Sequence, residues 1–98
     1  MSNVLSWFDG ALFAVGELDL DQSEGLRAAI HVAQAAGDTS LTVDLSLCTF
    51  VDSSALGMLL LLRERVHGEV QRVCLRGVHG QPRDVLVMAK FDRMFKVE

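Results

Sequence analysis

The spacing of hydrophobic positions changes along the chain, and these changes predict a succession of strands and helices. Two apolar runs rich in strand-forming residues, Val4–Phe8 and Ala11–Val15, are separated by Asp9 and Gly10. Asp-Gly between two such runs is typical of a tight hairpin turn, because both turn positions favour a positive φ. The first predicted unit is therefore an antiparallel hairpin.

Segment 22–36 carries the signals of a first helix. Asp21 occupies the cap position and Glu24 follows three residues later, which is the spacing of a capping box. Apolar residues then recur at helical intervals until Gly37, a residue that commonly ends helices.

The second half of the chain continues the alternation of strands and helices. Leu41–Leu45 alternates apolar and polar residues, as a strand does, and Ala55–Val66 is a strongly apolar helix with basic residues near its end. Val70–Leu75 is the next predicted strand. Pro82 suits the first turn of a third helix, and Phe95–Val97 is a predicted short edge strand.

This order predicts an α/β fold. Strands joined by helices run parallel with right-handed crossovers, so we expect a mixed, mostly parallel sheet of four to five strands, with an N-terminal hairpin and helices packed on it. With 98 residues, half of them hydrophobic, the chain can form one core, and we expect a single domain spanning residues 1–98. The loops after Val15, Leu45 and Leu75 should meet at one edge of the sheet, where open α/β sheets place their function.

The distribution of charge and the length of the longest apolar stretch limit which partners and locations we expect. Residues 1–62 hold eight acidic residues and one basic residue, whereas residues 63–98 hold five and eight, for a net charge of −4. The acidic first part argues against nucleic acid as a partner. The longest apolar stretch, Ala55–Leu62, is too short to span a membrane, and no signal peptide is evident. We therefore expect a cytoplasmic protein without membrane insertion, in which Cys48 and Cys74 are reduced thiols.

Polar residues gather at the expected functional edge, and four interpretations of them compete. A metal or phospho-aspartate site would need a nearby cation, which these loops lack. A Ser53–His79–Asp19 hydrolase triad would lack the usual nucleophile elbow. We therefore expect no catalytic site, no metal and no cofactor. The residues that these three loops bring to the edge are Glu17, Asp19, Asp21, Asp52, Ser53, Ser54 and His79.

The remaining interpretations concern the start of the second helix. Asp52 or Ser53 can cap that helix by accepting a hydrogen bond from a free backbone N–H group. A cap alone does not explain Gly57, which costs roughly 1 kcal/mol relative to alanine in a helix interior. A phosphorylatable serine at the helix N-terminus offers a reason, because phosphate is stabilised there and would change what a partner meets.

Three segments resemble the STAS domain family. Asp52–Gly57, preceded by Phe50 and Val51, is similar to its signature loop and second helix, although Ala55 stands where the family more often has glycine. Gly16–Asp19 resembles its Gly-Glu-Leu-Asp segment, and Lys90–Val97 resembles its last helix-to-strand junction. Together the resemblance covers about residues 11–97 in matching order.

The resemblance is greatest to bacterial anti-anti-sigma factors (anti-sigma factor antagonists). It implies binding to an anti-sigma factor with serine kinase activity, which releases a sigma factor until phosphorylation of Ser53 ends binding and a phosphatase restores it. Ser54 is the alternative acceptor. Two alternative functions are a STAS subunit bound to the ATPase of a lipid-transport ABC system and a stressosome-like scaffold or sensor domain. The sequence makes no prediction of the oligomeric state. The expected partner-binding residues are Asp19, Asp21, Asp52, Ser53, Ser54, Ala55 and Gly57.

Overall fold

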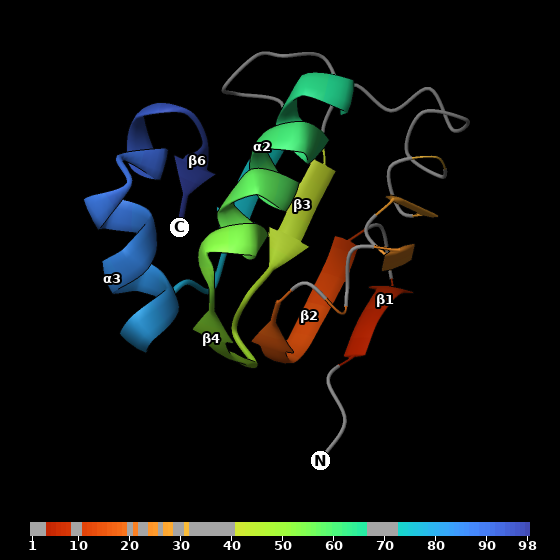
Figure 1. Ribbon diagram of the computed structural model, residues 1–98, viewed down its shortest axis with the longest axis horizontal. Coiled ribbons are helices and arrows are strands. Elements are labelled where there is room, and N and C mark those ends of the chain that lie inside the picture. Colours follow the sequence, from red (N-terminus) through yellow and green to blue (C-terminus); the bar gives the residue numbers. More distant parts are fainter. Residues whose placement is uncertain are drawn as a thin grey trace.

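The computed structural model describes residues 4–8, 11–19, 21, 24–25, 27–28, 31, 41–66 and 73–98. These residues form a sheet with helices packed on it (Figure 1). The elements in chain order are β1 (Val4–Phe8), β2 (Ala11–Leu18), β3 (Leu41–Asp44), β4 (Cys48–Val51), α2 (Ser53–Val66), β5 (Val73–Arg76), α3 (Gly80–Met88), the 3-10 helix η3 (Phe91–Arg93) and β6 (Lys96–Val97).

The strands form one mixed sheet in the order β1-β2-β3-β5-β6, with β4 added beside β2. β1 pairs antiparallel with β2, as the hairpin pattern predicts, and all other pairs are parallel. The predicted α/β fold is therefore confirmed. The sheet has six strands rather than four to five, because β4 forms from a segment that showed no strand pattern of its own.

β2 is longer than predicted and pairs with two strands in succession. Its first part, Ala11–Phe13, pairs with β3, and its last part, Gly16–Leu18, pairs with β4. The register shifts between Gly16 and Glu17, where Gly16 adopts φ 84° and its N–H donates to the Leu47 carbonyl at 3.0 Å. Glycine suits this position because residues with a Cβ disfavour a positive φ. The shift brings the end of β2 beside the end of β4.

The core lies between the sheet and α2, which crosses the sheet in Figure 1. Leu59 and Leu62 of α2 and Val43 and Leu75 of the sheet are at most 1% exposed. These residues belong to one continuous apolar cluster, which also contains the stacked rings of Phe91 in η3 and Phe95 just before β6, 5.1 Å apart. Burying each such side chain contributes about 1.5–3 kcal/mol. The core thus fixes α2 rigidly on the sheet.

Several predicted boundaries shift in the structure. α2 begins at Ser53, two residues before the predicted start, and α3 begins at Gly80, so that Pro82 lies within its first turn. β6 confirms the predicted edge strand. The Asp9-Gly10 turn, residues 70–72 and most of the helix predicted over 22–36 lie outside the described residues. The described residues of that helix are helical, namely Glu24, Gly25, Arg27, Ala28 and His31.

Two further observations bear on the sequence-based expectations. Cys48 and Cys74 are both free thiols, as predicted. In the part of the chain that the structure describes, no helix has the length and apolarity needed to cross a membrane.

Candidate functional site

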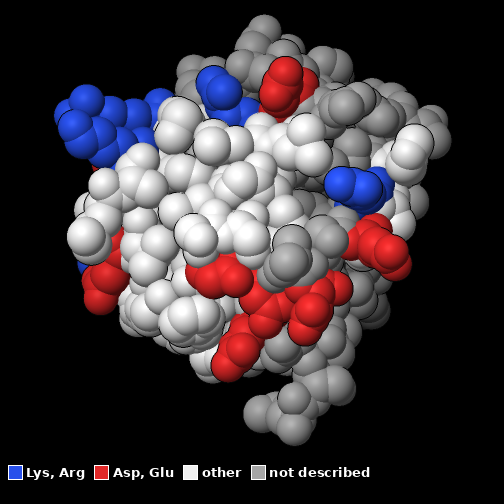
Figure 2. Space-filling model, in the orientation of Figure 1, with Lys and Arg blue, Asp and Glu red and all other residues white. Residues whose placement is uncertain are grey.

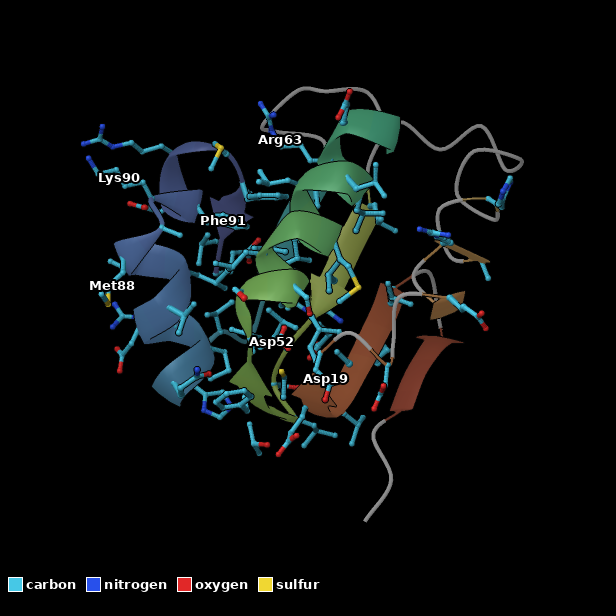
Figure 3. All side chains as sticks on the ribbon, in the orientation of Figure 1. Asp19, Asp52, Arg63, Met88, Lys90 and Phe91 are labelled. Carbon is cyan, nitrogen blue, oxygen red and sulfur yellow. The ribbon has the colours of Figure 1, made fainter. Side chains whose placement is uncertain are left out.

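Asp19 and Asp52 lie side by side because they follow paired strand residues. Leu18 and Val51 are partners in the parallel register of β2 and β4, and the Asp52 N–H approaches the Leu18 carbonyl at 3.4 Å. Figure 3 shows both carboxylates at the same end of the sheet, below the start of α2. The loop after β2 and the head of α2 therefore form one continuous surface.

Asp52 is the N-cap of α2. Its Oδ1 accepts a hydrogen bond from the Ala55 N–H at 2.9 Å and another from the Ser54 hydroxyl at 2.6 Å. The pKa of Asp52 is below its ordinary value, and the largest cause is the hydrogen bond from the Ser54 hydroxyl. Partial burial acts in the opposite direction but is outweighed. A cap of this kind typically stabilises a protein by about 1 kcal/mol. Asp52 is thus a structural anion at neutral pH.

The two serines at the head of α2 have different surroundings. Ser54 is half-buried and its hydroxyl is engaged by Asp52, whereas Ser53 is exposed. Within the described part of the chain, no hydrogen bond engages the Ser53 hydroxyl. Ser53 therefore offers its oxygen to solvent at a position where the helix N-terminus favours an added negative group.

Gly57 lies one turn after Ser53 on the exposed side of α2. Apart from its chain neighbours and the backbone of its own helix, a Cβ built on Gly57 would meet no heavy atom of the described residues within 4 Å, so no packing contact among those residues requires a glycine there. Ala55 has the opposite environment, since it is 0% exposed. The expectation that Ala55 contacts a partner directly is therefore wrong: its side chain packs in the core, because the helix turns this position toward the sheet.

Acidic side chains lie at the end of β2 and in the loop that follows it, which runs beside the end of β4. Glu17 and Asp21 are exposed and Asp19 is half-buried, with its Oδ1 accepting from the Asp21 N–H at 2.9 Å. Figure 2 shows acidic groups gathered on the lower part of this face, while basic groups lie around its upper and outer margin. We refer to Glu17, Asp19, Asp21 and Asp52 as the acidic rim; of these, Asp19 and Asp52 lie side by side at the start of α2.

His79 does not join this rim as part of a triad. Its Nε2 lies 2.8 Å from the carbonyl oxygen of Ser46, in the turn that precedes β4, whereas Ser53 follows β4. With Nε2 donating to this carbonyl, only Nδ1 could accept a proton, and among the described residues no hydrogen bond joins His79 to Ser53. The described residues thus contain Ser53, His79 and Asp19 without the hydrogen bonds that a triad requires.

The turn before β4 is fixed by a second polar group, which sequence analysis missed. Asp44 is 7% exposed, and its carboxylate accepts from the Ser46 N–H at 2.8 Å and from the Arg76 Nε at 2.9 Å. Burial by itself would raise the pKa of Asp44, but the hydrogen bonds from Ser46 and Arg76 outweigh it and lower the pKa. Buried carboxylates are normally paired in this way. The pairing joins β3 to β5 behind the site.

Sequence analysis also missed the contact of Gln81, which lies in the first turn of α3, with Val51. Its Oε1 accepts from the Val51 N–H and its Nε2 donates to the Val51 carbonyl, both at 2.9 Å. The two residues are 30 positions apart, so no local pattern signals the contact. It fixes the residue that precedes the Asp52 cap.

Among the described residues, no group of three His, Cys, Asp or Glu side chains could hold a metal ion. What the site offers is an exposed hydroxyl at a helix N-terminus, an acidic surround and an open glycine.

A family model described as Mlab, STAS domain matches residues 9–97. The match spans nearly all of the described strands and helices, including both segments of the site. The chain therefore belongs to the STAS domain family, as the resemblance of its three segments indicated.

Individual relatives agree with this assignment. Over 55 residues the chain is 44% identical to a STAS-domain containing protein of Pseudomonas aeruginosa (strain UCBPP-PA14), covering 56% of this chain and 54% of that protein. The match thus spans about half the length of the curated relative.

Solved structures share the fold. An anti-sigma factor antagonist from Mycobacterium paratuberculosis superposes with a TM-score of 0.75 at 22% identity, covering 98% of this chain and 83% of the other. The Bacillus cell fate determinant SpoIIAA in its phosphorylated form superposes with a TM-score of 0.65 at 22% identity, covering 99% and 91%. At these identities the likeness establishes the common fold.

Proposed function

We propose that this protein is an anti-sigma factor antagonist of the cytoplasm that binds a kinase-type anti-sigma factor and is switched off by phosphorylation of Ser53. The observation that carries the proposal is the contrast at the head of α2. The Asp52 carboxylate and the Ser54 hydroxyl are engaged in the hydrogen bonds of the helix cap, whereas Ser53 is exposed. One hydroxyl is therefore available for modification without loss of the cap.

The electrostatics of the site explain how modification would act. Phosphate on Ser53 would lie near the free N–H groups of α2, so the fold tolerates it. The same phosphate would add a charge of about −1.5 to −2 to a surface that already carries Asp19, Asp21 and Asp52. A partner that fits the unmodified surface would then face an unfavourable desolvation and repulsion. Modification thus changes recognition while it leaves the fold intact.

The test combines partner capture with mass spectrometry. The tagged wild-type protein is used to recover partners from the native cytoplasm, and the recovered fraction is incubated with ATP. We expect a serine kinase in that fraction and transfer of one phosphoryl group to Ser53, with release of ADP. Ser53→Ala should still recover the kinase but accept no phosphate, and Ser54→Ala should be modified normally. Phosphate on Ser54 alone would contradict the assignment.

A second candidate is a STAS subunit bound to the ATPase of a lipid-transport ABC system. The observation that favours it is the matching family model, whose description names Mlab and no sigma-factor regulator. In this case the head of α2 and Gly57 would contact the ATPase without a phosphorylation cycle. The same capture experiment distinguishes the two, since it would recover an ATPase with permease subunits and Ser53 would stay unmodified.

A further inference from the structure

We infer that Gln81 is a positioning residue for the Ser53 loop, which it holds in place through the backbone of β4. Its side chain forms two hydrogen bonds of 2.9 Å with one residue, accepting from the Val51 N–H and donating to the Val51 carbonyl. Ser53 follows Val51 by two residues. The inference rests on the proposed function of Ser53, and its test separates the two.

The geometry of β4 explains why these two bonds matter. Backbone groups of successive strand residues point alternately to the two edges of the strand. The Asp52 N–H points toward β2, where it meets the Leu18 carbonyl, so the backbone groups of Val51 point to the opposite edge. At that edge the Gln81 amide supplies the donor and the acceptor that a further strand would supply. An amide side chain can do this because it carries both groups.

A second contact from the same region holds the other end of β4. His79, which precedes α3, places its Nε2 2.8 Å from the Ser46 carbonyl in the turn before β4. Gly77 lies so close to Ser46 that an added Cβ would come within 2.8 Å of the Ser46 Cβ. The segment before α3 and the first turn of α3 therefore hold β4 at the turn that precedes it and at its last residue. Of these contacts, that of Gln81 lies next to the Asp52 cap and Ser53.

Positioning of this kind has a kinetic consequence. A kinase transfers phosphate only when the serine oxygen is held close to the phosphorus and in line with the leaving group. Loss of both Gln81 bonds would let the end of β4 and the head of α2 move together. We expect the phosphorylation rate to fall more than the affinity for the kinase, because the exposed contact groups of the rim would remain.

The first measurement is amide hydrogen exchange, which needs no partner. Gln81→Met keeps a side chain of similar length without either bond, and Gln81→Glu keeps the acceptor while losing the donor. Arg83→Met is the matched control, since Arg83 is an exposed residue of the same helix. In Gln81→Met we expect about tenfold faster exchange at the Val51 amide and faster exchange at the Ala55 amide. In Gln81→Glu, which keeps the acceptor for the Val51 N–H, we expect a smaller increase at both amides. Exchange in the Arg83→Met control should equal that of wild type. Melting curves establish that each variant is folded.

The second measurement uses the serine kinase recovered with the wild-type protein. We expect kcat to fall about tenfold in Gln81→Met with KM within twofold of wild type, and no change in Arg83→Met. Wild-type exchange at Val51 and Ala55 in both Gln81 variants would overturn the inference, whatever the kinetics. A wild-type kcat in Gln81→Met would overturn it as well. If wild-type protein is never phosphorylated while exchange in the variants is faster, the proposed function fails and the positioning role of Gln81 stands.

Discussion

The Ser54 hydroxyl donates a 2.6 Å hydrogen bond to the Asp52 carboxylate, which also caps α2 through the Ala55 N–H. The neighbouring Ser53 has no such role. We therefore expect Ser54→Ala to lower the free energy of unfolding by about 1 kcal/mol and Ser53→Ala to change it by less than about 0.5 kcal/mol. Urea unfolding of both variants beside wild type measures the difference. Equal losses would mean that the two serines contribute alike to the cap.

Ser53→Asp is expected to weaken partner binding while Ser53→Ala does not. A carboxylate at the start of α2 is stabilised by the helix N-terminus, so the variant should unfold no more readily than Ser53→Ala. In the interface, however, the new charge must lose its water beside Asp19 and Asp52, which costs about 2 kcal/mol or a thirtyfold loss of affinity. Calorimetric titration against the captured partner tests this. Equal affinities of wild type, Ser53→Ala and Ser53→Asp would show that the acidic rim is not part of the interface.

Gly57→Ala separates stability from binding. Beyond the neighbouring backbone of α2, no heavy atom in the part of the chain that the structure describes lies within 4 Å of the new Cβ, so the helix can accept it. Alanine favours a helix interior by up to about 1 kcal/mol over glycine, and we expect the variant to be more stable by a similar amount. If a partner approaches α2 closely at Gly57, the same methyl group should weaken binding at least tenfold. Unchanged affinity together with raised stability would place the interface elsewhere.

Acid should destabilise the protein in part through Asp44. Its pKa is lower in the folded state than its ordinary value of 3.8, because the bonds from Ser46 and Arg76 outweigh the opposing effect of burial. The unfolded chain therefore binds more protons in acid, and stability falls as the pH drops below about 4. Asp44→Asn should be less stable at neutral pH and should lose less on acidification.

Unfolding in urea at about pH 7 and about pH 3 measures this dependence. Asp52, whose pKa is also lowered, contributes with the same sign and should leave a residual slope in Asp44→Asn. An equal loss of stability in the variant and wild type would show that Asp44 gains nothing from its pairing in the folded protein.

The sequence by itself determined the order of the elements other than β4, and it predicted a candidate site at the head of α2. Apolar runs together with turn and cap signals specified the hairpin, α2, α3 and the short strand β6, because such signals are local along the chain. The segment Asp52–Gly57 identified the head of α2, since cap and glycine signals are local and can be found along the chain.

Only the tertiary structure decided how that site is held. β4 has four residues, buried at its ends and exposed at Thr49 and Phe50, so it lacks the alternation by which strands are predicted. It exists because the register shift at Gly16 opens the end of β2 to a second partner. The contacts of Gln81 with Val51 and of His79 with Ser46 join residues 30 or more positions apart. Such contacts form only when α3 and the segment before it pack against β4, and no local preference of the chain encodes them.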